Sequence, residues 1–283
     1  MENVAASRGR VLVTGASKGI GRAIAERLAH SGWEVIGTCR DPRALPVAER
    51  VKGVSYLPLD LSRESSVAAL ARKVGRVDVL VNNAGESPVG PAEEFPLGRV
   101  RSHFEVNFFG PVRLTQVLVR PMRERGRGTI IFIGSIRSEA PTPFSSFYSA
   151  SKSALRSFAG CLRLEVKQYG VRVAVIAPWH VRTTLSQEMQ VRRGSPYREA
   201  LERVKADRDR RIAAAPDPRS VADAVEQVIA APNPKPFSTV GKPILSLLMR
   251  LAPRGFVERI SARMVKLHGA APGRIRGRPG RTL

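Results

Sequence analysis

The chain has 283 residues, of which 43% are hydrophobic and 25% charged, and this globular composition excludes a disordered chain. Its 47 lysines and arginines against 24 acidic residues give a net charge of +23, which bears on partners and solubility rather than on the fold. Two distant cysteines exclude a disulfide framework and argue against a zinc site; with no signal-peptide core and no membrane-length apolar stretch, we expect a cytoplasmic protein.

Short apolar strands alternate with amphipathic helices along most of the chain. This order predicts right-handed βαβ units and one doubly wound α/β domain, residues 1–235, in which helices cover both faces of a parallel sheet. Helical patterns begin at the glycines before residue 22 and at Ser62, an expected N-cap, and long ones cover about residues 99–125 and 147–169. Runs typical of buried strands occur at residues 10–14, 33–39, 54–58, 77–82, 129–134 and 171–176.

The sequence changes character after residue 235. Prolines separate two short helical patterns, so we expect a C-terminal helical extension at residues 236–268 and a disordered basic tail at 269–283. Eleven basic residues and one acid lie between Lys235 and Leu283. Two interpretations stay open: the helices cover the substrate pocket, or their basic and apolar faces make a peripheral contact with an anionic membrane.

A glycine-rich turn separates the first predicted strand from the first predicted helix. Gly15, Gly19 and Gly21 occupy this turn. Glycines permit a tight turn and bring backbone N–H groups and a helix N-terminus close to a phosphate. The turn therefore predicts a nucleotide-binding site.

A tyrosine and a lysine share one face of the predicted helix at 147–169. Tyr148 and Lys152 are four residues apart, and a lysine ammonium favours the phenolate form of a neighbouring tyrosine, so the pair can exchange a proton with a substrate oxygen. Ser135 ends a strand, where its hydroxyl can hydrogen-bond a carbonyl. Asn107 falls in an apolar helical stretch, where a buried amide needs partners.

Together these motifs, in this order and at these spacings, resemble the short-chain dehydrogenase/reductase family over about residues 10–230. The resemblance rests on residues 14–21 and 82–85 and on the four side chains above. It implies a Rossmann-type domain that transfers a hydride between a nicotinamide cofactor and an alcohol/ketone pair. By this resemblance the tyrosine is the general acid/base, the lysine tunes it and binds the nicotinamide ribose, the serine polarises the carbonyl, and the asparagine holds the water of a proton relay.

The same resemblance implies a cofactor site, which we expect to take NADP(H). Arg40 directly follows the second strand, where an acidic residue would hold a ribose 2′-hydroxyl; with Lys18, it suits a 2′-phosphate instead. Asp60 is similar to the aspartate that contacts the adenine ring. No metal site is expected. The complete implied cofactor set is Gly15, Ser17, Lys18, Gly19, Ile20, Gly21, Arg40, Asp60, Leu61, Asn83, Ala84, Gly85, Tyr148, Lys152, Pro178, Val181 and Thr183.

The substrate is less well defined by the sequence. Trp179 follows Pro178 where the family usually has a glycine, and it can place a large ring over the pocket beside His180. With Phe144 and Met189, these residues predict an apolar pocket for a lipophilic ketone, as in the hydroxysteroid and retinol dehydrogenase branch that the chain resembles most. The arginine-rich insertion at 184–212 is the expected place for a substrate lid.

The sequence is also compatible with functions other than the reduction of a lipophilic ketone. A 3-oxoacyl thioester reductase is the main alternative, since an acidic carrier protein would suit the basic surface. A protein that senses NADP(H) without turnover is disfavoured by the intact set of four catalytic residues. Nucleic-acid binding is not expected, because the sequence has no aromatic–basic interleaving and no recognition motif. The family resemblance implies a homodimer or homotetramer assembled through the two long helices.

Overall fold

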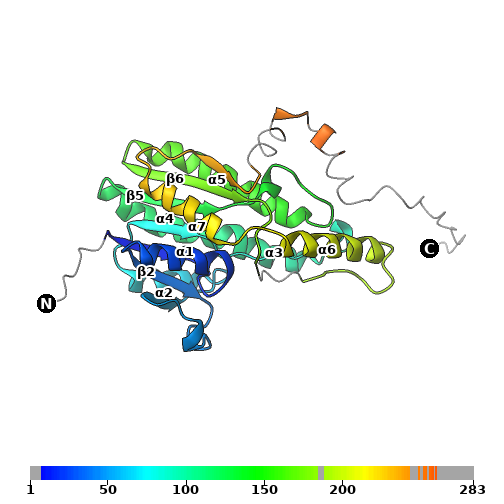
Figure 1. Cartoon of the computed structure of the whole chain (residues 1–283), viewed down its shortest axis with the longest axis horizontal. Helices are drawn as coiled ribbons and strands as arrows, with labels where there is room; N and C mark the ends of the chain where they lie inside the picture. The colour runs from blue at the N-terminus through cyan, green and yellow to red at the C-terminus, as the bar shows by residue number, and fades with distance from the viewer. Residues whose placement is uncertain are drawn as a thin grey trace, which may run out of the picture.

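The computed structural model describes residues 8–183 and 188–242, together with residues 248, 251–253, 255–257 and 259. Within them, seven parallel strands form one sheet in the order β3-β2-β1-β4-β5-β6-β7 (Figure 1). The strands are β1 (Arg10–Val13), β2 (Glu34–Cys39), β3 (Val54–Pro58), β4 (Val79–Asn82), β5 (Gly128–Ile133), β6 (Val171–Pro178) and β7 (Phe237–Val240). The helices are α1 (Gly19–His30), α2 (Glu64–Val74), α3 (Leu97–Phe104), α4 (Gly110–Glu124), α5 (Ser146–Lys167), α6 (Arg198–Ala213) and α7 (Arg219–Ala230).

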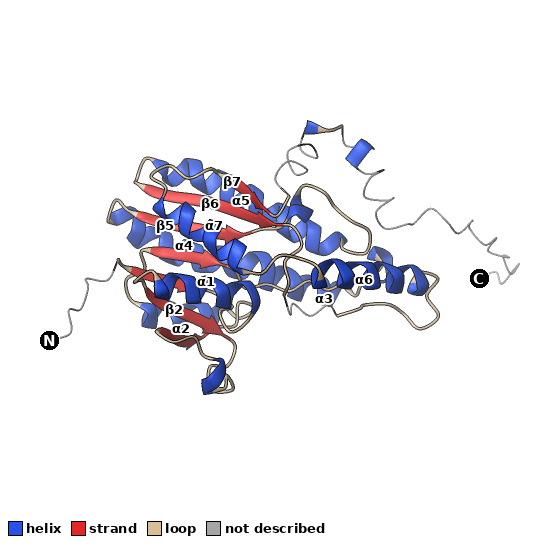
Figure 2. Cartoon of the chain, in the orientation of Figure 1, coloured by secondary structure: helices blue, strands red, loops and turns tan. Residues whose placement is uncertain are grey.

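The central strands are buried on both sides because they are short runs of β-branched and other apolar residues. All four residues of β4 are buried, and β5 is buried from its second residue onward. A strand of this kind needs a helix on each of its faces, which is the arrangement of a doubly wound parallel sheet. Figure 2 shows the strands as a layer between helices, with α1 and α7 in front of it. The predicted fold class is therefore confirmed.

Two apolar cores fill the space between these layers. On one face, α1 and α7 pack through residues such as Leu28 and Val225 onto the sheet. On the other face, α2, α4 and α5 contribute residues such as Leu70, Leu114 and Leu155. Because both cores lie beside the strands, the carboxyl edge of the sheet stays open for a binding site.

The helix predicted at 99–125 is interrupted. Its first part, α3, runs into a π-helical turn, Glu105–Phe109, before α4 begins at Gly110. Gly110 packs so closely that a Cβ atom there would lie 2.4 Å from the carbonyl oxygen of Leu61. π-Turns inside helices are often found at functional sites, and this one contains Asn107.

Two boundaries differ from the sequence-based predictions. Helix α2 begins at Glu64 with Arg63 as its N-cap, because Ser62 is instead bound by the carboxylate of Asp60 through both its N–H and its hydroxyl. The sheet also continues past residue 235, since β7 pairs with β6. β7 was missed because its four residues form no clear apolar run.

The C-terminal part of the chain is described only at a few positions. The expected helical extension falls almost wholly outside the described residues, and the expected disordered tail entirely so. Among the residues that the structure describes, no helix has the length and apolar character needed to cross a membrane.

Candidate active site

A cavity of about 550 Å³ opens at the carboxyl edge of the sheet. The cavity lies where the order of the strands reverses. β2 pairs with one side of β1 and β4 with the other, so the chain adds its later strands to opposite sides of β1. Ligands of doubly wound sheets bind at such a switch point. The lining segments follow β1 to β6 and include parts of α5 and α6.

The glycine turn forms one wall of the cavity. Gly15 and Gly19 have positive φ angles of 67° and 55°, which only glycine adopts without strain. A Cβ atom on Gly21 would lie 2.1 Å from the carbonyl oxygen of Gly15. The N-terminus of α1 begins at Gly19, so its unpaired N–H groups are at the cavity, and the turn fits a dinucleotide phosphate.

Thr14 and Asn83 hold this turn against the end of β4. The hydroxyl of Thr14 accepts hydrogen bonds from the N–H groups of Asn83 at 2.9 Å and Ala84 at 3.0 Å. The amide of Asn83 donates to the carbonyl oxygens of Thr14 at 2.8 Å and Gly15 at 3.3 Å. These bonds satisfy the buried polar groups of the turn and fix its shape.

Two basic side chains lie where the adenosine half of a dinucleotide would sit. Lys18 and Arg40 line the cavity and are both exposed. The neighbouring acid, Asp41, faces its own turn, where it accepts hydrogen bonds from the N–H groups of Arg43 and Ala44. This end of the cavity therefore presents two cations, while the neighbouring carboxylate is engaged by its own turn.

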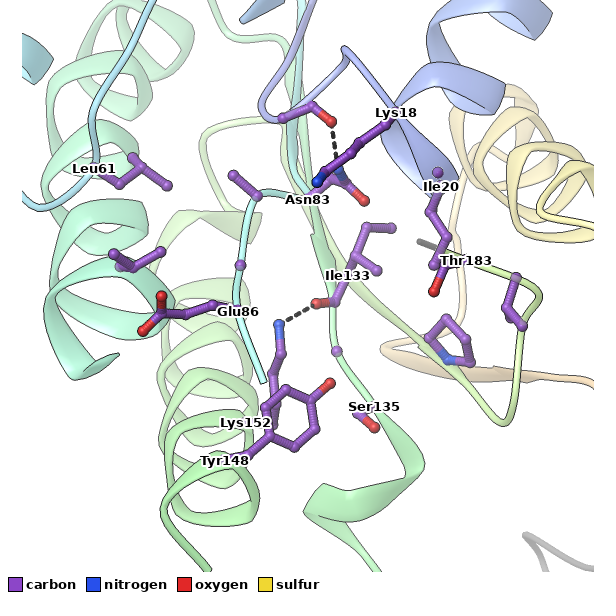
Figure 3. Close-up of a pocket in the computed structure, with 18 of the residues that line it drawn as sticks. Lys18, Ile20, Leu61, Asn83, Glu86, Ile133, Ser135, Tyr148, Lys152 and Thr183 are labelled. Atoms are coloured by element: carbon purple, nitrogen blue, oxygen red, sulfur yellow. Dashed lines mark hydrogen bonds between the residues drawn. The ribbon is translucent and has the colours of Figure 1, made fainter. Parts of the chain in front are cut away.

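Tyr148 and Lys152 come to the cavity from the first turns of α5. Lys152 is only 5% exposed, and its ammonium donates to the carbonyl oxygen of Ile133 at 2.9 Å (Figure 3). The ammonium also lies 5.9 Å from the centre of the Tyr148 ring. Burial lowers the pKa of Lys152, while the charge of Tyr148 opposes this shift. The pair is thus electrostatically coupled, with the ammonium of Lys152 buried and Tyr148 half-buried at the cavity wall.

Ser135 completes this group from the end of β5. Its side chain is 8% exposed, and its hydroxyl oxygen accepts a hydrogen bond from the N–H of Arg137 at 3.3 Å. Ser135 and Tyr148 face the same open space in Figure 3. Two hydroxyls and an ammonium at one point can bind a carbonyl oxygen and supply it with a proton.

Asn107 lies behind these residues, outside the cavity wall. Its side-chain oxygen accepts from the N–H of Glu86 at 2.9 Å, and its amide donates to the carbonyl of Glu86 at 3.0 Å and to the hydroxyl of Ser151 at 3.3 Å. His103 is fully buried beside it, 3.1 Å from the same hydroxyl. The amide expected to need partners therefore has them, and they connect the π-turn to α5.

Glu86 carries a negative charge at the cavity wall. Burial alone would raise its pKa, but hydrogen bonds and charge from His103 and Arg99 outweigh burial and lower the pKa to about 2. Arg99 bridges two acids, with contacts of 2.6 Å to Glu86 and 3.0 Å to Glu188. This bridge joins α3 to the segment that follows β6.

The opposite end of the cavity, beyond Tyr148, is lined by Trp179 and His180 together with Arg137 and Arg208. Burial, followed by the charges of nearby basic groups including both arginines, lowers the pKa of His180 to about 4. The imidazole is therefore neutral at physiological pH. Trp179 is held by a backbone hydrogen bond from its N–H to the carbonyl oxygen of Val240 at 3.0 Å.

The structure brings nearly all the predicted site residues to this one cavity. Gly21 and Asn107 are the exceptions among the cofactor and catalytic sets, and each lies one layer behind the wall. Those that line it are Gly15, Ser17, Lys18, Gly19, Ile20, Arg40, Asp60, Leu61, Asn83, Ala84, Gly85, Ser135, Tyr148, Lys152, Pro178, Val181 and Thr183.

The structure places two of the four predicted substrate contacts outside the wall of the main cavity. Phe144 has a positive φ of 62°, and its ring packs on Tyr197, 6.2 Å away between centres. It lines a separate cavity of about 10 Å³. Met189 is instead held by a bridge to Val89 at the edge of the fold. The ring of Phe144 thus packs in a loop, and the backbone of Met189 pairs with Val89, both outside the lining of the main cavity.

Several cavity residues were missed by sequence reasoning. Arg137 stands two positions after Ser135, a signal that was available but not used. Arg208 is one of many arginines in the insertion at 184–212. Glu86 and Arg99 belong to no motif, because their ion pair joins segments that only the fold brings together.

Comparisons with known proteins agree with this geometry. A family model described as short chain dehydrogenase matches residues 9–194. The chain is 37% identical over 200 residues to mouse "Dehydrogenase/reductase SDR family member 7B", a match that covers 66% of this chain but only 62% of that protein. It is 30% identical to a "3-ketodihydrosphingosine reductase" of Bacteroides thetaiotaomicron, over 84% of this chain and 89% of the relative.

A solved structure shares the fold over almost the whole chain. The short-chain dehydrogenase from Streptomyces avermitilis superposes with a TM-score of 0.77 at 32% identity, and the match covers 93% of this chain and 96% of the other. The arrangement of the sheet and its helices is therefore shared with a solved short-chain dehydrogenase.

Proposed function

Because the chain belongs to the short-chain dehydrogenase/reductase family, whose members use NAD(H) or NADP(H), we propose that it is an NADP(H)-dependent enzyme that interconverts a ketone and a secondary alcohol. One observation carries the proposal: Tyr148, Ser135 and the buried Lys152 meet at the same cavity as the glycine turn. These three side chains can therefore transfer a proton to a substrate that lies beside a bound nucleotide.

Each of the three side chains has a distinct task in ketone reduction. The bound cofactor supplies the hydride. Tyr148 donates its phenolic proton to the substrate oxygen as that oxygen gains negative charge. Ser135 donates a hydrogen bond to the same oxygen, and the ammonium of Lys152 stabilises the phenolate that remains. In the oxidative direction, Tyr148 takes the proton back.

Asn107 and its partners support this group from behind. The amide holds the backbone of Glu86 and the hydroxyl of Ser151, which itself donates to the carbonyl oxygen of Tyr148 at 2.9 Å. The π-turn thereby fixes the position from which Tyr148 projects. A water of a proton relay beside Asn107 is part of this proposal.

The choice of NADP(H) rests on the far end of the cavity. Lys18 and Arg40 are exposed there, and no carboxylate is paired with either of them among the described residues. Asp41 is used by its own turn. A 2′-phosphate would make charge-assisted hydrogen bonds with the two cations, each stronger than a neutral bond.

A lipophilic substrate is favoured by the wall near Tyr148. Ile136, Trp179 and Ile212 present apolar surface at this end of the cavity. A relative of this chain is described as a "3-ketodihydrosphingosine reductase", and an apolar wall fits a lipid-like ketone of that kind. A 3-oxoacyl thioester would also place an apolar chain there, so the two substrate classes must be separated by assay.

The proposal is tested by following the oxidation of NADPH with a panel of long-chain ketones, steroid ketones and acetoacetyl thioesters. We expect turnover with at least one ketone class and a much lower KM for NADPH than for NADH. No turnover with any carbonyl, in either direction and with either cofactor, would overturn the enzymatic proposal. Preference for thioesters would favour the alternative substrate.

We further propose that the enzyme works in the cytoplasm as a homodimer or homotetramer. Large apolar side chains stay exposed on the π-turn (Phe109), on α4 (Val117), on α5 (Leu164) and in the turn after α5 (Tyr169). Exposed apolar patches of this kind mark subunit contacts. Sedimentation at micromolar concentration should give at least twice the 30.9 kDa mass of one chain, and a pure monomer would contradict this assembly.

A further inference from the structure

Two arginines lie at the substrate end of the cavity without an acidic partner. Arg137 and Arg208 both line the main cavity and also the small cavity behind it. Within the described part of the chain, neither forms an ion pair, and the side chain of Arg137 donates only to the hydroxyl of Thr142. Nη1 of Arg208 is buried and has no hydrogen-bond partner. Buried donors of this kind are costly unless a ligand completes them.

Arg208 differs from the other basic residues of α6 in having no acidic partner in the described segments. The other basic residues of α6 each have an acid within 4 Å, on the same helix, as in the pairs Arg203–Glu199 at 3.0 Å and Lys205–Asp209 at 2.6 Å. The remaining pairs are Arg198–Glu202, Arg210–Asp207 and Arg211–Asp207. The positions three and four residues from Arg208 hold Val204, Lys205, Arg211 and Ile212, so no acid can reach it along the helix.

Arginines with a structural role are satisfied differently in this protein. Arg163 donates to the carbonyl oxygens of Val173 and Pro234, and Arg172 donates to the hydroxyl of Thr129 at 2.7 Å. Both tie strands and loops together through several bonds. Arg137 and Arg208 make no comparable set of bonds, which argues against a purely structural role for them.

The two guanidinium groups also act on each other. Burial and then the charge of Arg137 lower the pKa of Arg208 to about 10, and burial lowers the pKa of Arg137. Among the described residues, the acids that line the cavity are Asp60 and Glu86, and Glu86 is already bridged by Arg99 at 2.6 Å. Two like charges in one partly buried space repel each other, and an anion between them would offset that repulsion.

This cationic cluster is distinct from the cations expected to bind the cofactor. Arg137 is two residues from Ser135 and donates its N–H to that hydroxyl, so it lies beside the serine proposed to bind the substrate carbonyl. The charge of Tyr148 raises the pKa of both arginines and so opposes the effect of their burial. Lys18 and Arg40 lie instead beside the glycine turn and the end of β2. An anion at the cluster would therefore sit a few bonds from the reacting carbonyl.

We propose that the substrate is a ketone or alcohol that carries an anionic group, a carboxylate or a phosphate monoester, near its reacting carbon, and that Arg137 and Arg208 bind this group. The inference rests on the proposed function, because it names the substrate class of the same site. Arginine suits both anions, since its planar fork of N–H groups matches their oxygen pairs. The apolar wall then holds the rest of the molecule.

The test compares ketones that differ only in charge. The probes are 4-oxodecanoate against its methyl ester, and 2-oxodecyl phosphate against 1-hydroxydecan-2-one, each with saturating NADPH. We expect a kcat/KM at least 10-fold higher for one or both anions than for the neutral partner. Arg208→Met should raise the KM for that anion by about 10- to 100-fold and leave the KM for the neutral ketone nearly unchanged, as expected for a lost charge-assisted hydrogen bond. Arg203→Met, on the exposed side of the same helix, is the matched control and should change neither value.

The outcome separates this inference from the proposed function. Equal kcat/KM for charged and neutral ketones, with Arg208→Met indistinguishable from Arg203→Met, overturns the anion site and leaves the reductase intact. If no probe is turned over, calorimetric titration of the full chain with octyl phosphate and decanoate, in the presence of NADP⁺, still tests the cluster. Binding that weakens at least 10-fold in Arg208→Met and not in Arg203→Met supports the site, and its absence in the wild-type protein rejects it.

Discussion

The two ends of the cavity are both positively charged, but they are built differently. At the cofactor end the backbone forms the site: two glycines with positive φ, the N-terminus of α1 and a hydrogen-bonded turn fixed by Thr14 and Asn83. At the substrate end long side chains form it, with Arg137 from the end of β5 and Arg208 from α6. A backbone site serves a ligand shared by a whole family, whereas a side-chain site can change with few substitutions.

The largest expected effect lies between the two ends, at Tyr148. Tyr148→Phe removes the proposed proton donor and leaves both ends of the cavity in place. We expect kcat to fall by about 10²–10⁴-fold, the usual contribution of general acid catalysis. The affinity for NADPH, measured by fluorescence titration, should stay within about threefold of wild type. A variant that keeps more than about a tenth of the wild-type kcat shows that another group supplies the proton.

The charge at the cofactor end is tested by Arg40→Asp. Loss of a charge-assisted hydrogen bond to a 2′-phosphate, of about 1.5–3 kcal/mol, should weaken NADPH binding by roughly 10- to 150-fold. NADH, which has no such phosphate, should lose little affinity. Arg127→Asp, in the turn that precedes β5 at the far edge of the sheet, is the control. Equal losses for both cofactors would remove the argument for NADP(H).

The backbone at the cofactor end is tested by Gly21→Ala. The added Cβ would lie 2.1 Å from the carbonyl oxygen of Gly15, so the turn must shift, and overpacking of this kind costs about 1–3 kcal/mol of stability. We expect a lower free energy of unfolding in urea and weaker binding of NADPH and NADH alike. Gly160→Ala, in the open on α5, is the matched control and should be neutral or stabilising. If the two variants are equally stable, the turn is not packed as described.

The smallest effect concerns pH and the substrate end. The pKa of His180 is about 4, compared with 6.5 for an unperturbed histidine. Between these values the unfolded chain binds a proton that the folded chain rejects, so the free energy of unfolding falls as the pH drops from 6.5 to about 4. His180→Gln removes this contribution, and its urea unfolding curves should give a flatter dependence on pH in that window.

Glu86 serves as an internal control for that experiment. Its pKa is lowered from 4.5 to about 2, so its stabilising contribution is present above pH 4.5 and is lost as the pH falls toward 2. Both proteins keep this carboxylate, so both should lose stability in the lower window. Identical slopes of wild type and His180→Gln between pH 6.5 and 4 would show that His180 is not held neutral by its surroundings.

The sequence predicts the cofactor end well because that end depends on local rules. Glycine spacing, the strand before it and the helix after it lie within about a dozen residues, and each constrains the backbone directly. Tyr148 and Lys152 are equally local, since four residues on one helix fix their separation. The family model, the relatives and the fold agree with the family and the fold class that these motifs predict.

The substrate end was predicted less well because its residues meet only in the folded chain. Apolar character alone assigns Phe144 and Met189 to the pocket, whereas in the structure neither lines the main cavity: the ring of Phe144 packs on Tyr197 and the backbone of Met189 pairs with Val89. Arg208 was hidden among paired arginines, although the absence of an acid three or four residues away on its helix was visible in the sequence. The π-turn around Asn107 gave no sequence signal beyond a polar residue in an apolar helix.

A two-by-two comparison of Arg40→Asp and Arg208→Met tests most directly whether the two ends of the cavity bind separate ligands. For each variant we would measure the dissociation constant of NADPH and the KM of an anionic ketone. We expect Arg40→Asp to raise the dissociation constant of NADPH by roughly 10- to 150-fold and to change the KM of the anionic ketone little. We expect Arg208→Met to raise the KM of the anionic ketone and to change the dissociation constant of NADPH little. If both substitutions raise the same constant, the proposal that the two ends of the cavity bind separate ligands is contradicted.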